Sequence, residues 1–162
     1  MEKRKPAKVH TLMTALEKVR GYCAYQERCQ QEVRDKLYEL GLHQEEVEQG
    51  ITVLIGEGFV NEERFATAYA GGKFRIKKWG KVKIRAGLKA RKISEYCIKK
   101  ALAAIDDYEY EKVLQKTISD GMKKASRHKE PLRTRAAVRY AISHGFEPEQ
   151  VWSAVKLTQE DT

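Results

Sequence analysis

The side chains with the most pronounced chemistry in this sequence are the lysines and arginines between Lys73 and Lys100. This segment carries twelve Lys or Arg against a single acid, Glu95. A second basic segment, from Lys123 to Arg139, has seven Lys or Arg against Glu130. Clusters of this kind bind phosphate through charge and counterion release, so they indicate a polyanionic partner such as nucleic acid.

The rest of the chain has the opposite charge. The formal net charge of the whole chain is +9, yet nine acids lie between Cys29 and Glu63 against only Arg34 and Lys36. Such polarity also suits a protein partner with a charge pattern of its own, because complementary charge steers and orients docking.

Catalytic and metal-binding spacings are missing from the sequence. The three cysteines form no CxxC pair, the four histidines are scattered singly, and there is no HExxH. The segments GEGFVN and GGKF lack the spacing of a phosphate-binding loop. The carboxylate pair Asp106–Asp107 is expected in a solvated loop between helices. We therefore expect no enzymatic activity, no cofactor and no metal.

The lack of long apolar segments bears on the cellular location. No stretch approaches the roughly 18 apolar residues of a membrane span, and MEKRKPAKVH lacks the apolar run of a signal peptide. We expect a cytoplasmic protein without membrane contact. Its cysteines are then free thiols in a reducing compartment.

The elements that position these charges repeat along the chain. Apolar residues recur with a shift of 51 residues, at Val33 and Ile84, Leu37 and Leu88, Leu42 and Ile93, Val47 and Ile98, and Ile51 and Leu102. A looser third copy, with a shift of 104, sets Gly145 and Phe146 over Gly41 and Leu42. A repeat of this kind indicates stacked copies of one supersecondary unit.

Each copy has helical periodicity. Val33, Leu37 and Leu40 are spaced by four and three, which makes one apolar stripe on a helix. Gly41 can adopt the left-handed conformation that ends such a helix, and the pair Gly71–Gly72 is expected to break a later one. We predict an all-α monomer, an elongated solenoid-like chain of three tandem three-helix repeats. These span residues 1–60 with a basic N-terminal tail, 61–106 and 107–162.

The basic segment forms a stripe on its predicted helix. With a helix beginning near Lys81, the residues Lys78, Lys81, Arg85, Lys89 and Lys92 lie on one side of the apolar face, and Lys77 and Lys78 approach from the preceding turn. Three interpretations remain open: a solvated face, phosphate binding, and docking onto an acidic or nucleoprotein surface. Trp79 and Phe74 can stack on bases or pack between modules.

Three motifs, in order along the chain, carry a resemblance to a known family. They are E-[LV]-x-x-K-L at Glu32, Val33, Lys36 and Leu37, then G-[YF]-[LV]-[ND]-[DE]-x-R-F-A from Gly58 to Ala66, and K-x-G-x-x-[KR]-[IL] at Lys78, Gly80, Lys83 and Ile84. Their order and the three-module layout resemble the RecX regulatory proteins of bacteria, over about residues 11–157. The sequence departs from the family at Cys29, usually Ser or Thr, and at Lys92, often Gly.

The resemblance implies a partner and an activity. RecX proteins bind the RecA recombinase, lie along the groove of the RecA–DNA filament and suppress its ATPase, strand-exchange and coprotease activities in DNA repair and recombination; some also touch DNA. The residues expected to contact filament or DNA are Lys77, Lys78, Lys81, Arg85, Lys89, Arg133, Arg135 and Arg139. The alternatives are an autonomous, non-specific DNA-binding helical protein and a purely structural scaffold.

Overall fold

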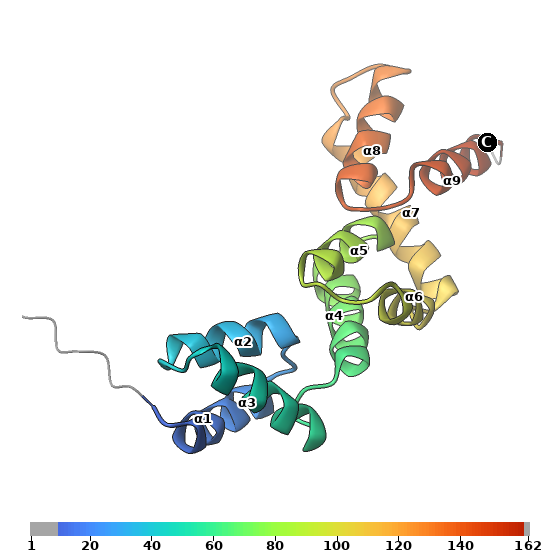
Figure 1. Ribbon diagram of the computed structural model, residues 1–162. Helices are drawn as coiled ribbons and strands as arrows, with labels where there is room; N and C mark the ends of the chain where they lie inside the picture. The colour runs from blue at the N-terminus through green and yellow to red at the C-terminus, as the bar shows by residue number, and fades with distance from the viewer. Residues whose placement is uncertain (1–9, 161–162) are drawn as a thin grey trace, which may run out of the picture. The chain divides into compact units, whose positions relative to one another are not determined.

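The computed structural model describes residues 10–160, which contain nine α-helices and no strand (Figure 1). The helices are α1 (Leu12–Tyr25), α2 (Gln30–Glu39), α3 (Gln44–Gly56), α4 (Glu62–Lys77), α5 (Lys81–Ala90), α6 (Glu95–Ala103), α7 (Asp107–Lys124), α8 (Leu132–Ser143) and α9 (Pro148–Glu160). The predicted all-α class is confirmed. The expected basic N-terminal tail, residues 1–9, lies outside the described residues.

The helices gather into two compact units. The first contains α1, α2, α3, the beginning of α4 up to Phe65, and Arg91–Ile93. The second contains Ala66–Ala90 and the chain from Ser94 onward. The module boundaries expected at residues 60 and 106 stay a prediction, since compactness divides the chain elsewhere.

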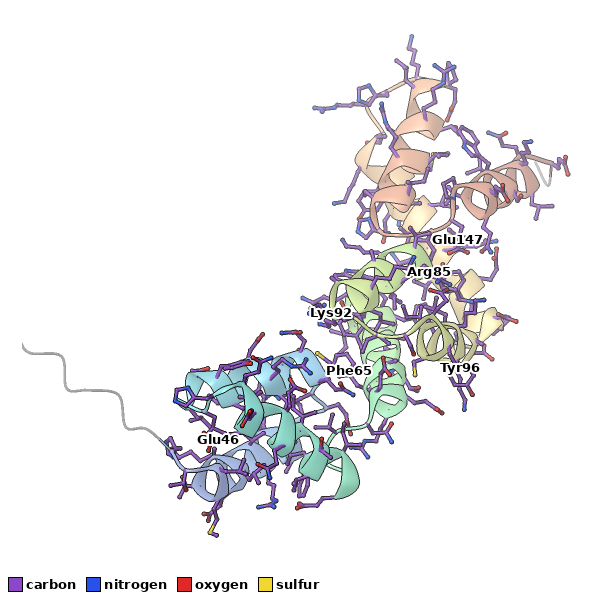
Figure 2. The ribbon with its side chains drawn as sticks, in the orientation of Figure 1. Glu46, Phe65, Arg85, Lys92, Tyr96 and Glu147 are labelled. Atoms are coloured by element: carbon purple, nitrogen blue, oxygen red, sulfur yellow. The ribbon has the colours of Figure 1, made fainter. Side chains whose placement is uncertain are left out.

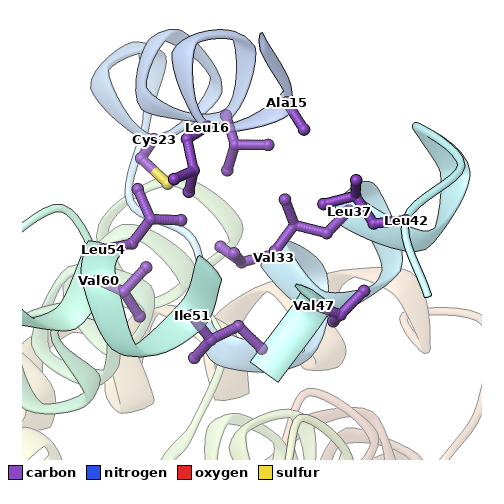
Figure 3. Packing of buried hydrophobic residues seen from close by; sticks show 11 residues of the cluster. Ala15, Leu16, Cys23, Val33, Leu37, Leu42, Val47, Ile51, Leu54 and Val60 are labelled. Carbon is purple, nitrogen blue, oxygen red and sulfur yellow. The ribbon is translucent and has the colours of Figure 1, made fainter. Parts of the chain in front are cut away.

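The core of the first unit lies between three helices (Figure 3). Apolar side chains from each helix meet there, namely Ala15, Leu16, Val19 and Cys23 from α1, Val33 and Leu37 from α2, and Val47, Ile51 and Leu54 from α3. Val33 and Leu37 are two of the three residues that the four-and-three spacing placed on one stripe, and the third, Leu40, is partly buried directly after α2. Burying a side chain of Val, Leu or Ile size contributes about 1.5–3 kcal/mol, so this cluster holds the unit together.

A left-handed residue ends α2, as the sequence predicts. Gly41 has φ 92°, and its N–H donates to the carbonyl of Tyr38 at 2.9 Å. The N–H of Leu42 donates to the carbonyl of Leu37 at 3.3 Å, and the Leu42 side chain is buried. This pair of bonds is a Schellman motif, which satisfies the last carbonyls of the helix and turns the chain into α3.

The same turn recurs in the later repeats. Gly145, with φ 97°, donates to Ile142 at 2.9 Å, while Phe146 donates to Ala141 at 3.3 Å and is buried. Between α5 and α6 the left-handed position is taken by Lys92, with φ 58°. A side chain with a Cβ is strained in this conformation, so the second repeat forms the turn with a residue that disfavours it.

Helix α4 corrects one expectation. The Gly71–Gly72 pair does not break it, because α4 runs without interruption from Glu62 to Lys77. Ala70 and Phe74 are buried on one side and hold the helix against its neighbours. The guanidinium of Arg75 lies over Gly71, where an added Cβ would meet its Nη1 at 2.8 Å. Tertiary contacts therefore outweigh the low helix propensity of glycine.

The second unit contains a close backbone contact between two turns. Gly80, at the start of α5, donates its N–H to the carbonyl of His144 at 2.8 Å, and Val82 donates to Gly145 at 2.9 Å. A Cβ added at Gly80 would overlap the backbone of Gly145 and Phe146. Only glycine permits this approach, and the contact joins the turn before α5 to the turn before α9.

An aromatic cluster supports that contact. The ring of Tyr110 lies 5.7 Å from the ring of Phe74 and 5.3 Å from the ring of Phe146, between centroids. Its hydroxyl accepts the N–H of Lys81 at 2.9 Å and donates to the carboxylate of Glu147. Burial, and then the hydrogen bond to Glu147, raise the pKa of Tyr110. The side chain stays neutral and bonded at physiological pH.

Candidate nucleic-acid and partner interface

The basic residues Lys77 and Lys78 lie where α4 ends and the turn to α5 begins. Helix α5 begins at Lys81, as predicted, whereas Lys77 is the last residue of α4 and not part of the turn. Lys78 follows in the left-handed conformation, with φ 58°. Lys77, Lys78 and, on α5, Lys89 are exposed, and the described residues offer none of them an ion-pair partner. Their ammonium groups are available to an anionic partner.

Two other members of the predicted stripe have partners inside the protein. Arg85 forms an ion pair with Glu95 at the start of α6, and the hydrogen bond from Arg85 lowers the pKa of that carboxyl. The ammonium of Lys81 lies 4.9 Å from the centre of the Tyr110 ring, and this side chain is half-buried. The stripe that the helical wheel predicts is therefore not uniform, because Glu95 neutralises its centre.

A shallow depression runs beside this part of the stripe. Its volume is about 360 Å³, and it is lined by Lys81, Arg85, Lys99 and Glu147 together with Val82, Leu102 and Ala103. Figure 2 labels two of these residues, Arg85 and Glu147. Three of the four charged side chains of this depression are cationic. Because it is open and not enclosed, it suits contact with an anionic surface better than capture of a small molecule.

The three arginines of the second predicted patch also have two different roles. Arg133 binds the loop between α7 and α8, since its Nε donates to the carbonyl of His128 at 3.1 Å and its Nη2 to that of Ser126 at 3.4 Å. Arg135 and Arg139 are exposed on α8, and within residues 10–160 neither has an ion pair. Arg133 therefore shapes the loop, while Arg135 and Arg139 are left to meet a partner.

Sequence reasoning missed one cationic cluster. The ammonium groups of Lys73 and Lys83 lie 4.9 Å and 4.7 Å from the centre of the Trp79 ring. The helical wheel placed Lys83 away from the stripe, and only the turn between α4 and α5 brings it to the tryptophan. The available signal was the position of a tryptophan among lysines, in KKWGKVK.

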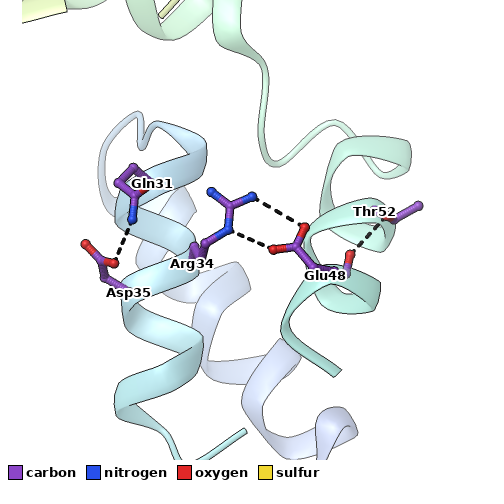
Figure 4. Close-up of polar contacts among 5 residues, drawn as sticks. All are labelled: Gln31, Arg34, Asp35, Glu48 and Thr52. Atoms are coloured by element: carbon purple, nitrogen blue, oxygen red, sulfur yellow. Dashed lines mark hydrogen bonds and ion pairs between the residues drawn. The ribbon is translucent and has the colours of Figure 1, made fainter. Parts of the chain in front are cut away.

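The first unit handles its charges differently. Three of its arginines bind carboxylates: Arg34 contacts Glu48 through two hydrogen bonds of 2.8 Å and 3.4 Å (Figure 4). The other pairs are Arg20 with Glu57 at 2.7 Å and Arg64 with Glu27 at 2.6 Å. Solvent screens these pairs, so they add little stability. They do engage three of the six Lys and Arg residues between residues 10 and 65, a range that also holds eleven acids, so this part of the surface is acidic.

Other site classes find no support in the described part of the chain. Residues 10–160 hold no group of three His, Cys, Asp or Glu side chains placed to bind a metal. The Asp106–Asp107 pair begins a helix and does not lie in a loop as expected: Asp106 caps α7, its Oδ1 accepting the N–H of Glu109 at 2.9 Å, and Asp107 is the first residue of α7. None of the helices in this range combines the length and apolar character that crossing a bilayer requires.

Two family models match the chain. The model described as the first three-helix domain of RecX matches residues 15–52, and that described as the second three-helix domain matches residues 61–102. The chain belongs to the RecX family. RecX proteins are non-catalytic regulators associated with RecA, in agreement with the resemblance carried by the three sequence motifs.

Solved RecX structures share this fold. One, titled as the crystal structure of regulatory protein RecX, aligns with a TM-score of 0.81 at 21% identity and covers 90% of this chain and 71% of its own. The RecX of Lactobacillus salivarius aligns with a TM-score of 0.80 at 19% identity and covers 90% of this chain and 94% of its own. No curated protein sequence matches the chain.

Proposed function

We propose that this protein binds the RecA–DNA filament as a monomer and inhibits its ATPase, strand-exchange and coprotease activities in DNA repair and recombination. The observation that carries the proposal is the match of both three-helix domains to RecX. A regulator of a nucleoprotein filament must meet protein and phosphate together. The contrast between an acidic, internally paired first unit and a second unit with unpaired cations suits such a surface.

The contact residues proposed for DNA phosphate are those that stay exposed and unpaired within residues 10–160: Lys77, Lys78, Lys89, Arg135 and Arg139. Lys81 and Arg85 lie beside them, and Arg133 supports its loop. Each phosphate neutralised by such a group releases counterions, so affinity should fall steeply with salt. No catalytic role is assigned to any of these residues.

A second function has an observation in its favour. The unpaired cations of the second unit suffice for non-specific binding to any DNA, without a recombinase. The two functions predict different binding preferences. A filament regulator binds the assembled RecA–DNA filament more tightly than DNA alone, whereas an autonomous DNA-binding protein binds both equally.

The test measures affinity for single-stranded DNA, for RecA alone and for the assembled filament at one salt concentration, together with the ATPase rate of the filament. We expect tightest binding to the filament and a falling ATPase rate. Equal affinity for bare and RecA-coated DNA, with an unchanged ATPase rate, would support the autonomous DNA-binding protein instead.

Charge reversal locates the contact. The double variant Lys77→Glu with Lys89→Glu should weaken filament binding and reduce its salt slope by about two, one for each lost phosphate contact. The matched control is Lys18→Glu with Lys156→Glu, which makes the same chemical change at exposed positions of α1 and α9. Equal effects of the two pairs would mean that net charge alone governs binding.

A further inference from the structure

We propose that Trp79 is a stacking platform for a base of single-stranded DNA, and that Lys73 and Lys83 bind the phosphates on either side of that base. The inference deepens the proposed function, since it rests on DNA being one component of the partner. It assigns to Trp79 a contact that a charged stripe alone does not supply.

The position of Trp79 sets it apart from the aromatic core. Phe74, Tyr110 and Phe146 form that core, and Phe74 and Phe146 are buried. Phe74 on α4 therefore already supplies packing between the second and third repeats, through Tyr110 on α7. Trp79, five residues further on, is only half-buried in the turn between α4 and α5.

The cations around the ring are placed for phosphate. The ammonium groups of Lys73 and Lys83 lie 4.9 Å and 4.7 Å from the ring centre, and that of Lys73 also lies 5.4 Å from the centre of the Tyr69 ring. In the free protein the aromatic faces attract these ammonium groups. On a DNA strand the base can take the ring face while each flexible lysine swings to a neighbouring phosphate.

Acids do not compete for these lysines along the chain. No Asp or Glu lies between Lys73 and Glu95, and Glu95 is bound by Arg85. The acid that follows Gly145, Glu147, accepts the hydroxyl of Tyr110. Glu95 and Glu147 therefore each have a partner other than Lys73 and Lys83.

The backbone holds the tryptophan in place before any ligand arrives. The N–H of Trp79 donates to the carbonyl of Lys73 at 3.2 Å, and the preceding residue, Lys78, is left-handed. The following residue, Gly80, is fixed against Gly145 by the bond to His144. A platform fixed on both sides loses little conformational freedom on binding, which favours stacking.

The experiment uses tryptophan fluorescence in the full chain. Trp152, exposed on α9, is the only other tryptophan, so Trp152→Phe leaves Trp79 as the single reporter. This variant is titrated with oligo(dT) and with an abasic strand of equal length, which carries the same phosphates without bases. We expect oligo(dT) to quench Trp79 and the abasic strand to leave its emission nearly unchanged.

Affinity gives an independent readout. Loss of one stacked base weakens binding by roughly tenfold, so Trp79→Ala should bind oligo(dT) about tenfold more weakly and the abasic strand as before. Trp152→Ala is the matched control and should alter neither affinity. Lys73→Gln and Lys83→Gln should weaken both strands equally and keep the preference for bases, as expected of phosphate contacts.

The outcomes separate this inference from the proposed function. If oligo(dT) and the abasic strand quench Trp79 alike, or if polyglutamate does so as well, Trp79 senses charge and the stacking platform is wrong. If filament inhibition persists in that case, only the inference fails. If neither DNA nor the filament binds, both fail. Should Trp79→Ala not fold, the fluorescence titration of Trp152→Phe decides alone.

Discussion

Helices α2 and α5 occupy the same place in successive repeats, yet their polar faces have separate roles. Arg34 and Arg85 are equivalent by the 51-residue shift, and both bind a carboxylate on the helix that follows, Glu48 and Glu95 respectively. Around Arg34 the other charges are mostly acidic, whereas α5 adds Lys89 and the lysines before it. The repeats therefore share a core and an arginine–carboxylate pair but differ in net surface charge.

The residues before the two helices differ for a tertiary reason. Cys29 precedes α2 and is buried, and its backbone N–H donates to the carboxylate of Glu32 at 3.1 Å. Gly80 holds the equivalent position before α5 and has no room for a side chain, because the turn at Gly145 presses against it. One repeat thus uses this position for capping, and the other uses it to bind the next repeat.

The largest effect in this comparison should come from Gly80→Ala. Its Cβ would overlap the backbone of Gly145 and Phe146, which cannot move as a flexible side chain can. We expect a loss of roughly 3 kcal/mol in the free energy of unfolding, measured by urea denaturation. The control is Gly72→Ala, whose Cβ meets no atom within 4 Å and which should stabilise α4 by about 0.5–1 kcal/mol. If Gly80→Ala were as stable as the parent, the turn before α5 and the turn before α9 would not be in close contact.

Tyr110→Phe tests the same junction, with a smaller expected loss in the free energy of unfolding. The change leaves the N–H of Lys81 and the carboxylate of Glu147 without their shared partner. We expect a loss of about 1–3 kcal/mol by chemical denaturation. Thr14→Ser, a small change in the exposed cap of α1, should be nearly neutral by comparison.

The pH dependence of that loss has a definite sign. The folded-state pKa of Tyr110 is raised, so its contribution is fully present below about pH 10, the ordinary pKa of tyrosine, and is lost as pH rises further. Alkaline unfolding should therefore be less steep in Tyr110→Phe than in the parent. Parallel stability curves from pH 8 to 11 would contradict this account.

The turns that end α2 and α5 make a reciprocal pair of substitutions. Lys92 and Gly41 are equivalent by the repeat, and both are left-handed. Lys92→Gly should raise the free energy of unfolding by roughly 1 kcal/mol, because glycine adopts this conformation without strain, and Gly41→Lys should lower it by a similar amount. Calorimetry on both variants and the parent checks the signs. Changes of the same sign would show that the two turns are not equivalent.

The smallest effect on stability should accompany Glu95→Gln. Glu95 is exposed, so losing its pair with Arg85 should leave the melting temperature close to that of the parent. It should also release Arg85 to bind phosphate, which strengthens DNA binding and increases its salt slope by about one. The matched change in the first unit, Glu48→Gln, releases Arg34 amid acids and should alter DNA binding much less. An equal gain from both would remove the distinction between the two faces.

Much of the fold was accessible from periodicity. The three-and-four spacing of Val33 and Leu37 put both in the core, and the repeat carried the same assignment to Ile84 and Leu88. Gly41 marked a helix end, and the structure has it in the left-handed conformation directly after α2. These signals are local, because each depends on a few neighbouring residues of the chain. Gly71–Gly72 misled for the opposite reason, since contacts distant in sequence keep α4 intact.

The candidate interface was only partly accessible in the same way. The sequence by itself determined where the cations are and that the chain repeats, because charge and hydrophobic period are properties of residue order. Tertiary structure alone decided which cations are engaged: Glu95 takes Arg85, the loop carbonyls take Arg133, and Lys83 turns toward Trp79. A helical wheel describes one helix, and partners on neighbouring helices and turns become visible only when the chain has folded.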